Sequence, residues 1–421
     1  MRILGPSPRA AGLSAALLVA ALGSACVPFA EDADGGLVTD GAAPLDASEA
    51  PDAGPPDVFH SAPHAPFPEL LRNSGTVLRP LRVIAVVAAD DPLGDDLIAF
   101  TDALTHSSWL AASGASFGLD PSATSGHVKG PAIPAGTTVT RADFLSYIQG
   151  AIAGHYSPDG NTVFALFLPE GVTLELESGD LNTDCGYLYG YHLSYQDQGD
   201  AFALIQRCPP ERFTTDLEFT TEIASHEIIE AATNPRLDGW SLPMVSDPPW
   251  SGSPWFPLPE NADLCEHTRW SEGGHMYQRV LTNEAAQAGG DPCLPASPVP
   301  YYSVTASQAW FQGRAGRDVP IRLTGWSVSP VRSWSLQSTI LARSQSGFRA
   351  SVRSSSTTEI GGRTQQLIGN ARTATLTVSI PGDAPSGSWV VTEVDSFRRT
   401  DSGLPEGEDL YHLWVIGVYV P

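Results

Sequence analysis

A histidine and two glutamates in the middle of the chain have the spacing of a metal-binding helix. The stretch from Ser225 to Trp240 reads SHEIIEAATNPRLDGW, so His226, Glu227 and Glu230 form the pattern H-E-x-x-E. Residues i and i+4 of a helix lie on one face. His226 and Glu230 could therefore hold one metal ion with Glu227 beside it. The H-E-x-x-H zinc hydrolases place their ligands on a helix in the same way, with a histidine where this chain has the second carboxylate.

The flanking residues predict that this motif lies on a helix. Thr214 and Thr215 can cap its start, acidic residues follow in the first turns, and Asn234-Pro235 ends it. The alternative interpretation is an amphipathic helix whose acidic side chains are merely solvated. Residues outside the helix must decide between the two interpretations.

A third ligand must come from elsewhere in the fold, because a catalytic zinc takes three protein ligands and leaves one position open. We expect it to be Glu260, with Asp263 either an alternative ligand or the carboxylate that orients His226. Glu227 would act as the general base. Further histidines in a region rich in turns and aromatic residues could donate to a developing oxyanion, namely His192, His267 and His275.

The charge of this ligand set leaves two points undecided: which metal binds, and whether the site is catalytic. One neutral histidine and two carboxylates neutralise Zn²⁺ and lower its Lewis acidity, and the same oxygen-rich set suits Mn²⁺ or Ca²⁺. The alternative to a hydrolase is a non-catalytic surface module that binds wall polymer or another protein and has a structural or vestigial metal site. The sequence contains no phosphate loop or dinucleotide fingerprint.

The composition and the N-terminus indicate an exported protein. The 421 residues carry a formal net charge of −24, which argues against nucleic acid or an anionic membrane surface as a partner. Residues 1–25 have the basic start and the short apolar run of a signal peptide. Cys26 follows the small-residue cleavage site, as in bacterial lipoproteins. We therefore expect a lipid anchor on Cys26 at the cell envelope, with ordinary cleavage after Ala25 and release as the alternative.

Changes in composition divide the rest of the chain into three segments. Residues 26–68 are rich in Ala, Pro, Gly and Asp, and they predict a disordered acidic tether. Residues 69–298 alternate buried strands such as LRVIAVVAAD, TVFALFLPEG and AFALIQ with helices at about 95–113 and 140–154, a pattern typical of an α/β core.

The last segment, residues 299–421, consists of short alternating runs separated by Gly, Ser and Pro. This texture predicts an all-β, immunoglobulin-like sandwich. Its tryptophans are interpreted as core or half-buried strand residues, and the alternative is a sugar-binding platform. They are Trp326, Trp334, Trp389 and Trp414.

Four cysteines beyond Cys26 cluster in residues 69–298, which predicts two disulfides in an exported chain. The expected pairs are Cys185–Cys208 and Cys265–Cys293. A structural metal site is the alternative, but no C-x-x-C spacing supports it.

Taken together, these motifs resemble the plant phosphate-induced, EXORDIUM-like secreted proteins and their bacterial relatives. The shared elements, from about Asn73 to Leu294, are in order GTVL, a strand ending in LP-G, CGY…YH…C, SHEIIEAATNP, E-x-x-D-x-C and QRVLTN…C. The bacterial relatives with this His-Glu helix look like zinc metallopeptidases. The resemblance therefore implies a metallopeptidase-like domain, with a peptide or an extracellular polymer as substrate.

Overall fold

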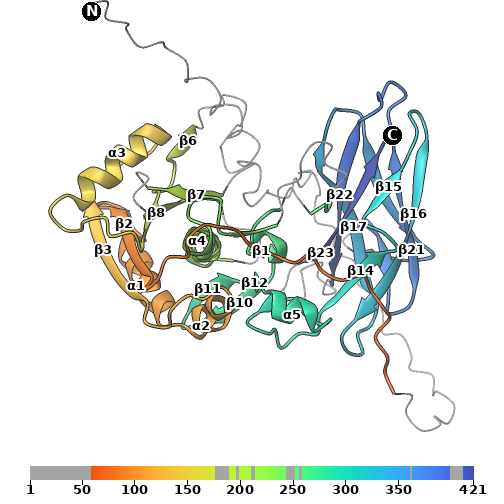
Figure 1. The fold of residues 1–421 in the computed structure, drawn as a ribbon, viewed down its shortest axis with the longest axis horizontal. Coiled ribbons are helices and arrows are strands. Elements are labelled where there is room, and N and C mark those ends of the chain that lie inside the picture. The colour runs from red at the N-terminus through yellow and green to blue at the C-terminus, as the bar shows by residue number, and fades with distance from the viewer. Residues whose placement is uncertain are drawn as a thin grey trace, which may run out of the picture. The chain divides into compact units, whose positions relative to one another are not determined.

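A computed structural model describes residues 58–175, 189–195, 199–209, 214–242, 252–255, 258–360, 363–398 and 411–421. The described chain divides into two units, one formed by Phe67–Ala296 and the other by residues 58–66 together with Ser297–Pro421. The predicted signal peptide, Cys26 and most of the predicted tether lie outside the described residues. Over the described chain, strands hold more residues than helices (Figure 1).

The first unit is organised around a five-stranded sheet with the order β3-β2-β5-β8-β7. The first four strands in this order run parallel, and β7 is antiparallel to β8. The three apolar runs predicted as buried strands are β2, β5 and β8. The strands of the sheet are β2 (Arg82–Ala88), β3 (Thr124–Gly130), β5 (Thr162–Phe167), β7 (Gly190–Ser194) and β8 (Ala201–Ile205).

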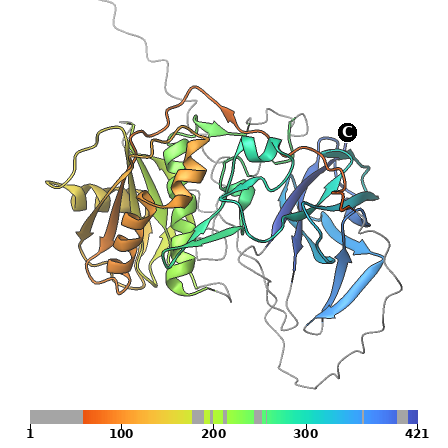
Figure 2. The same ribbon diagram turned by 90° about the horizontal axis from the view of Figure 1, so that it is seen from below.

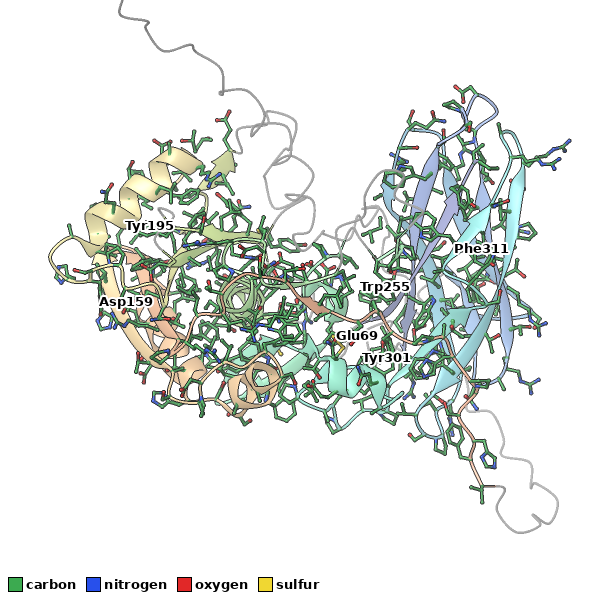
Figure 3. All side chains as sticks on the ribbon, viewed as in Figure 1. Glu69, Asp159, Tyr195, Trp255, Tyr301 and Phe311 are labelled. Atoms are coloured by element: carbon green, nitrogen blue, oxygen red, sulfur yellow. A yellow bond between two sulfur atoms is a disulfide. The ribbon has the colours of Figure 1, made fainter. Side chains whose placement is uncertain are left out.

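Different helices cover the two faces of this sheet (Figure 2). Helix α3 (Arg141–Ile152) packs Phe144 and Ile148 into an apolar cluster with Phe164 and Phe202. Tyr195 belongs to the same cluster and is labelled in Figure 3. Helices α1 (Gly94–Thr105) and α4 (Asp216–Thr233) pack on the other face. Both faces are covered, which explains why the central strands are apolar on both sides.

One expected helix is divided in two. The single helix predicted from 95 to 113 ends at Thr105, and α2 (Ser108–Ala115) follows as a separate helix. The Ser107 side chain accepts a hydrogen bond from Leu110 N at 3.0 Å, so it caps a new helix instead of continuing the first.

Short elements complete the first unit, and one of them is fastened by a disulfide. Cys265, at the end of the 3₁₀ helix η2 (Asp263–Cys265), is bonded to Cys293, which confirms that predicted pair. Cys208 is also disulfide-bonded, but Cys185 lies outside the described residues and its pairing stays a prediction. The other elements are β1 (Leu71–Arg72), β4 (Thr138–Thr140), β6 (Thr173–Glu175), β9 (Trp240–Ser241), β10 (Arg269–Glu272), β11 (His275–Gln278), β12 (Val280–Leu281), α5 (Asn283–Gln287) and β13 (Cys293–Leu294).

The second unit contains a four-stranded sheet, β14-β16-β21-β18, and a six-stranded sheet, β15-β23-β22-β17-β20-β19, the arrangement of a β-sandwich. Trp326, Trp334 and Trp414 are buried, as expected for core residues, and Trp389 is half-buried. These tryptophans therefore do not form an exposed platform. The strands are β14 (Tyr302–Ala306), β15 (Trp310–Gln312), β16 (Asp318–Ser327), β17 (Trp334–Arg343), β18 (Arg349–Ser354), β19 (Ser356–Ile360), β20 (Arg363–Ile368), β21 (Thr373–Ser379), β22 (Trp389–Phe397) and β23 (His412–Tyr419).

The last residues of the predicted tether pack on this second unit. Ala62 N donates to Asn370 Oδ1 at 2.9 Å, and the His64 ring stacks on Trp326 with centroids 3.8 Å apart. The folded chain therefore begins several residues before the boundary predicted at residue 68. Within the described residues, no helix has the length and apolar composition needed to cross a membrane.

Candidate metal centre

Helix α4 holds the H-E-x-x-E residues and is buried along almost its whole length. It begins with a capping box, in which Thr215 Oγ1 accepts from Glu218 N and Glu218 Oε2 accepts from Thr215 N. Every residue from Phe219 to Thr233 is buried, because the helix packs against the sheet on one side and β11 on another. The interpretation that the acidic residues of the motif are solvated is therefore wrong.

His226 faces two carboxylates, one from its own helix and one from η2. His226 Nε2 lies 3.2 Å from Glu230 Oε2 and 3.5 Å from Asp263 Oδ1. The ligand atoms of these three residues all lie within 4.8 Å of one another. The spacing argument thus placed His226 and Glu230 correctly on one face, and the fold adds Asp263 as the third member of the group.

A glutamine that sequence reasoning did not single out sets the orientation of the His226 ring. Gln278 Nε2 donates to Ala262 O at 2.7 Å, which turns Gln278 Oε1 toward His226 Nδ1 at 3.0 Å. Because an amide oxygen only accepts, Nδ1 carries a proton and Nε2 points toward the carboxylates. Only a proton or a cation between Nε2 and those oxygens makes the contact favourable.

His192 brings a second imidazole to the other side of Glu230. On β7, Tyr191 and Leu193 join the apolar cluster beneath α3, so the strand alternation directs His192 to the face that α4 covers. His192 Nδ1 lies 3.6 Å from Glu227 Oε2 and 3.6 Å from Glu230 Oε2. These three residues form a second group whose ligand atoms lie within 4.8 Å of one another. The alternation in GYHLS was the sequence signal for this position.

Glycine at position 190 allows Glu227 to lie against β7. A Cβ added at Gly190 would stand 2.8 Å from both Cγ and Oε1 of Glu227, closer than real Cβ atoms come to a neighbour. Glu227 Oε1 is buried and has no hydrogen-bond partner among the residues that the structure describes. Leaving a buried polar atom unsatisfied costs about 1–3 kcal/mol, so a ligand bound at this oxygen would remove that cost.

Hydrogen bonds hold the acidic side chains in place before any metal binds. Glu230 Oε1 accepts from the backbone N–H groups of Ala262 and Asp263 at 3.2 and 3.3 Å. Asp263 Oδ2 accepts from Glu260 N at 3.1 Å. Glu230 and Asp263 therefore each give one oxygen to the protein backbone and turn the other toward His226, which is the arrangement that a preorganised metal ligand needs.

The predicted ligand Glu260 contacts His192 instead of His226. Glu260 Oε1 lies 3.4 Å from His192 Nε2 and accepts a hydrogen bond from the Asn234 amide. Asn234 also caps α4, and its Oδ1 accepts from Gly239 N at 2.6 Å. Glu260 is thus placed to orient His192, while Asp263, predicted as the alternative, is the acid that approaches His226.

Burial and mutual repulsion raise the pKa values of two acids of this site, Glu230 and Asp263. Burial raises the pKa of Glu230 to about 7 despite the opposing effect of His226. Burial and the Glu230 charge raise the pKa of Asp263 well above its usual value. Burial disfavours the charged form of His192, but the Glu260, Glu227 and Glu230 carboxylates outweigh it and raise its pKa. The metal-free site therefore takes up protons, and a bound cation would replace them.

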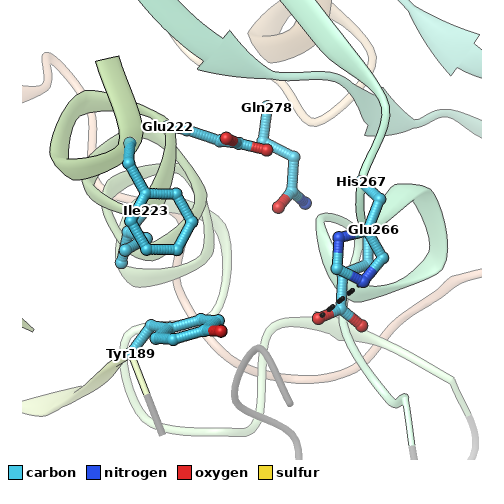
Figure 4. A pocket seen from close by; sticks show the side chains of 7 residues that line it. Tyr189, Glu222, Ile223, Glu266, His267 and Gln278 are labelled. Carbon is cyan, nitrogen blue, oxygen red and sulfur yellow. Dashed lines mark ion pairs between the residues drawn. The ribbon is translucent and has the colours of Figure 1, made fainter. Parts of the chain in front are cut away.

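Two of the predicted histidine donors lie outside these groups. His267 lines a pocket beside α4, with Nε2 3.7 Å from Glu266 Oε1 (Figure 4). His275 is half-buried on β11 and meets the Phe100 ring edge-on at 5.5 Å. Burial lowers the pKa of His275. Of the three histidines proposed as donors, only His192 lies among the acidic residues.

The pocket beside α4 adjoins the His226 group through Gln278, which borders both. Aromatic side chains form one part of its wall and acidic residues another (Figure 4). One acid, Glu222, accepts from Arg269 Nε at 2.7 Å. The pocket is lined by Tyr189, Phe219, Glu222, Ile223, Glu266, His267 and Gln278.

Comparison with known proteins gives no family for this chain. No protein-family model matches it, and no curated protein matches it. Domain 1 of VCBP3 from Branchiostoma floridae aligns with 29% of this chain and 96% of that chain, at 10% identity and a TM-score of 0.18. A beta-glucosidase from Listeria innocua aligns with 84% of this chain and 48% of that chain, at 10% identity and a TM-score of 0.15. Neither likeness supports an argument about fold or function.

Proposed function

We propose that the first unit is a metallopeptidase-like, zinc-dependent hydrolase whose metal is held by His226, Glu230 and Asp263. The observation that carries this proposal is the His226 ring, which is fixed by Gln278 and aimed at two buried carboxylates. Ligand atoms about 2.1 Å from zinc at tetrahedral angles lie about 3.4 Å apart. The spacings of 3.2 and 3.5 Å around Nε2 agree with that value.

The proposed ligand set differs from the sequence-based expectation in its third member. Asp263 replaces Glu260, because Asp263 is the acid whose oxygen reaches His226. The carboxylates would also accept Mn²⁺ or Ca²⁺, and zinc is favoured here by the imidazole nitrogen in the group.

Each remaining residue of the site has a role that its position supports. A bound zinc polarises a carbonyl and lowers the pKa of water. Glu227 Oε1, buried and without a hydrogen-bond partner, accepts the proton of the attacking water. Glu227 then delivers that proton to the nitrogen that leaves as the C–N bond breaks.

The proposed setting is the cell envelope. A signal peptide and a lipid on Cys26 would export the protein and anchor it, with a peptide or a cell-wall polymer as substrate and no nucleic acid partner. The EXORDIUM-like resemblance supports the same setting. We include in the proposal an immunoglobulin-like topology for the second unit, whose two sheets are compatible with it.

The proposal is tested with three variants of the full mature chain. Glu227→Gln should keep the zinc held by His226, Glu230 and Asp263 and lose hydrolysis of a mixture of unstructured fluorescent peptides, because it removes the proton acceptor and none of these three ligands. His226→Ala should lose the zinc of this site and hydrolysis as well. Glu284→Gln, an exposed acid on α5, is the matched control and should change neither. Zinc bound by the wild type without hydrolysis of any peptide or wall polymer would instead favour the non-catalytic surface module.

A further inference from the structure

We propose that this site holds two divalent metal ions, with Glu230 shared between them. The first ion takes His226 and Asp263 together with Glu230, as in the proposed function on which this inference rests. The second takes His192 and Glu227 together with Glu230. The two groups of ligand atoms have Glu230 as their single common member, and each is compact enough for one ion.

The distances in the second group match those in the first. His192 Nδ1 stands 3.6 Å from Glu227 Oε2 and 3.6 Å from Glu230 Oε2. Charge-assisted hydrogen bonds between a nitrogen and a carboxylate are about 2.7–2.9 Å long, whereas ligand atoms around a zinc ion are about 3.4 Å apart. Both groups therefore have a spacing that is compatible with atoms surrounding a cation.

Each histidine also has a partner on the side of its ring away from the shared carboxylate. Gln278 Oε1 lies 3.0 Å from His226 Nδ1, and Glu260 Oε1 lies 3.4 Å from His192 Nε2. Such partners hold metal-binding imidazoles in one tautomer. This repeated arrangement explains the position of Glu260, which approaches His192 instead of His226.

Two divalent ions balance the charge of the site when all four of its acids are ionised and both of its histidines are neutral. Glu227, Glu230, Glu260 and Asp263 are at most 6% exposed, and together they bring four negative charges when ionised. Within the described chain, the side chains that form ion pairs with these four acids are His192 and His226. One Zn²⁺ would leave two buried negative charges uncompensated, which is costly. Two ions leave none.

Glu227 provides an independent sign that the second position takes a ligand. Its Oε2 belongs to the second group, while its buried Oε1 has no hydrogen-bond partner. With Oε2 on the second ion, Oε1 stays available for the proton of the attacking water. Paired ions of this kind, about 3.5–4 Å apart, stabilise both the attacking and the leaving group of a displacement.

The test is the zinc stoichiometry of the mature chain, measured by native mass spectrometry after loading with zinc alone and desalting. The wild type should bind two zinc ions per chain, and His192→Ala should bind one. His155→Ala removes an exposed histidine of the same unit and should still bind two. Circular dichroism of each variant shows whether it folds, and the wild-type count decides the matter without any variant.

The possible outcomes separate this inference from the proposed function. One zinc in the wild type that His192→Ala retains would overturn the second position and leave the His226 site intact. One zinc that His192→Ala loses would also overturn it, by placing His192 on a single ion. No zinc at all would remove both proposals.

Discussion

Helices α3 and α4 both begin with a threonine capping box, but they bury different kinds of side chain. In α3, Thr140 and Asp143 form the box, and the buried side is apolar, with Phe144, Ile148 and Ile152. In α4, a similar box precedes a helix that buries acids and a histidine as well as apolar residues. The two starts are alike because capping depends only on residues three apart in sequence.

The difference arises from what surrounds each helix. One side of α3 is exposed, so its polar residues stay in water and its apolar side packs on the sheet. Helix α4 packs against the sheet and also against β11, so its polar residues are buried and must find partners on other elements. We therefore expect the free energy of unfolding to depend on apolar packing at α3, and on protonation and metal binding at α4.

The largest expected effect is a cavity beneath α3. Phe144→Ala removes a ring that packs on Phe202 with centroids 5.0 Å apart, and it should lower the free energy of unfolding by about 3–5 kcal/mol. Urea denaturation measures this change, and zinc stoichiometry should stay at the wild-type value. Loss of zinc in this variant would show that the two helices do not behave independently.

The second prediction concerns the pH dependence of the metal-free protein. The pKa of Glu230 is raised to about 7 from 4.5, so between these values the folded state holds a proton that the unfolded state has lost. The free energy of unfolding should therefore fall as pH rises from about 5 to 7, by on the order of 3 kcal/mol. The raised pKa of His192 acts in the same direction at higher pH.

Urea denaturation in chelator at several pH values checks this dependence. Glu230→Gln should flatten the slope, whereas Phe144→Ala should shift the curve without changing its slope. Stability of the metal-free wild type that rises between pH 5 and 7 would contradict the assignment of protons to the buried acids.

The third prediction is stabilisation by zinc. At a free zinc concentration of about 100 times the Kd of the His226 site, the wild type should gain about 2.7 kcal/mol from that site, since zinc binds only the folded site. His226→Ala should lose this gain, and Phe144→Ala should keep it in full. Thermal unfolding with and without zinc gives the comparison, and an equal gain in His226→Ala would place the stabilising ion elsewhere.

The smallest effect concerns the shared feature of the two helices. Thr140→Ala and Thr215→Ala should each cost about 1 kcal/mol, because each deletes the oxygen that accepts from the third residue of its helix. Thr140→Ser and Thr215→Ser keep that oxygen and should restore most of the stability. If Thr140→Ala and Thr215→Ala lose very different amounts of stability, burial must also change how much a capping hydrogen bond contributes.

Local sequence determined several features of this protein. The capping residues and Asn234 set the ends of α4, the i, i+4 spacing puts His226 and Glu230 on one face, and apolar runs identified β2, β5 and β8. The break at Ser107 is also encoded locally, since Ser107 is an N-cap residue. The apolar positions on both sides of Ser107 nevertheless predict one continuous helix. Such features are readable because they depend on residues only a few positions apart.

Tertiary structure alone decided the composition of the site. Asp263 and Glu260 lie three residues apart on one short segment, and the backbone of η2 selects which of them reaches His226. His192 joins the site because β7 pairs antiparallel with β8. This pairing places His192 opposite Ala203, on the sheet face that α4 covers. Sheet register and the packing of α4 bring together residues more than thirty positions apart, and no local propensity encodes such contacts.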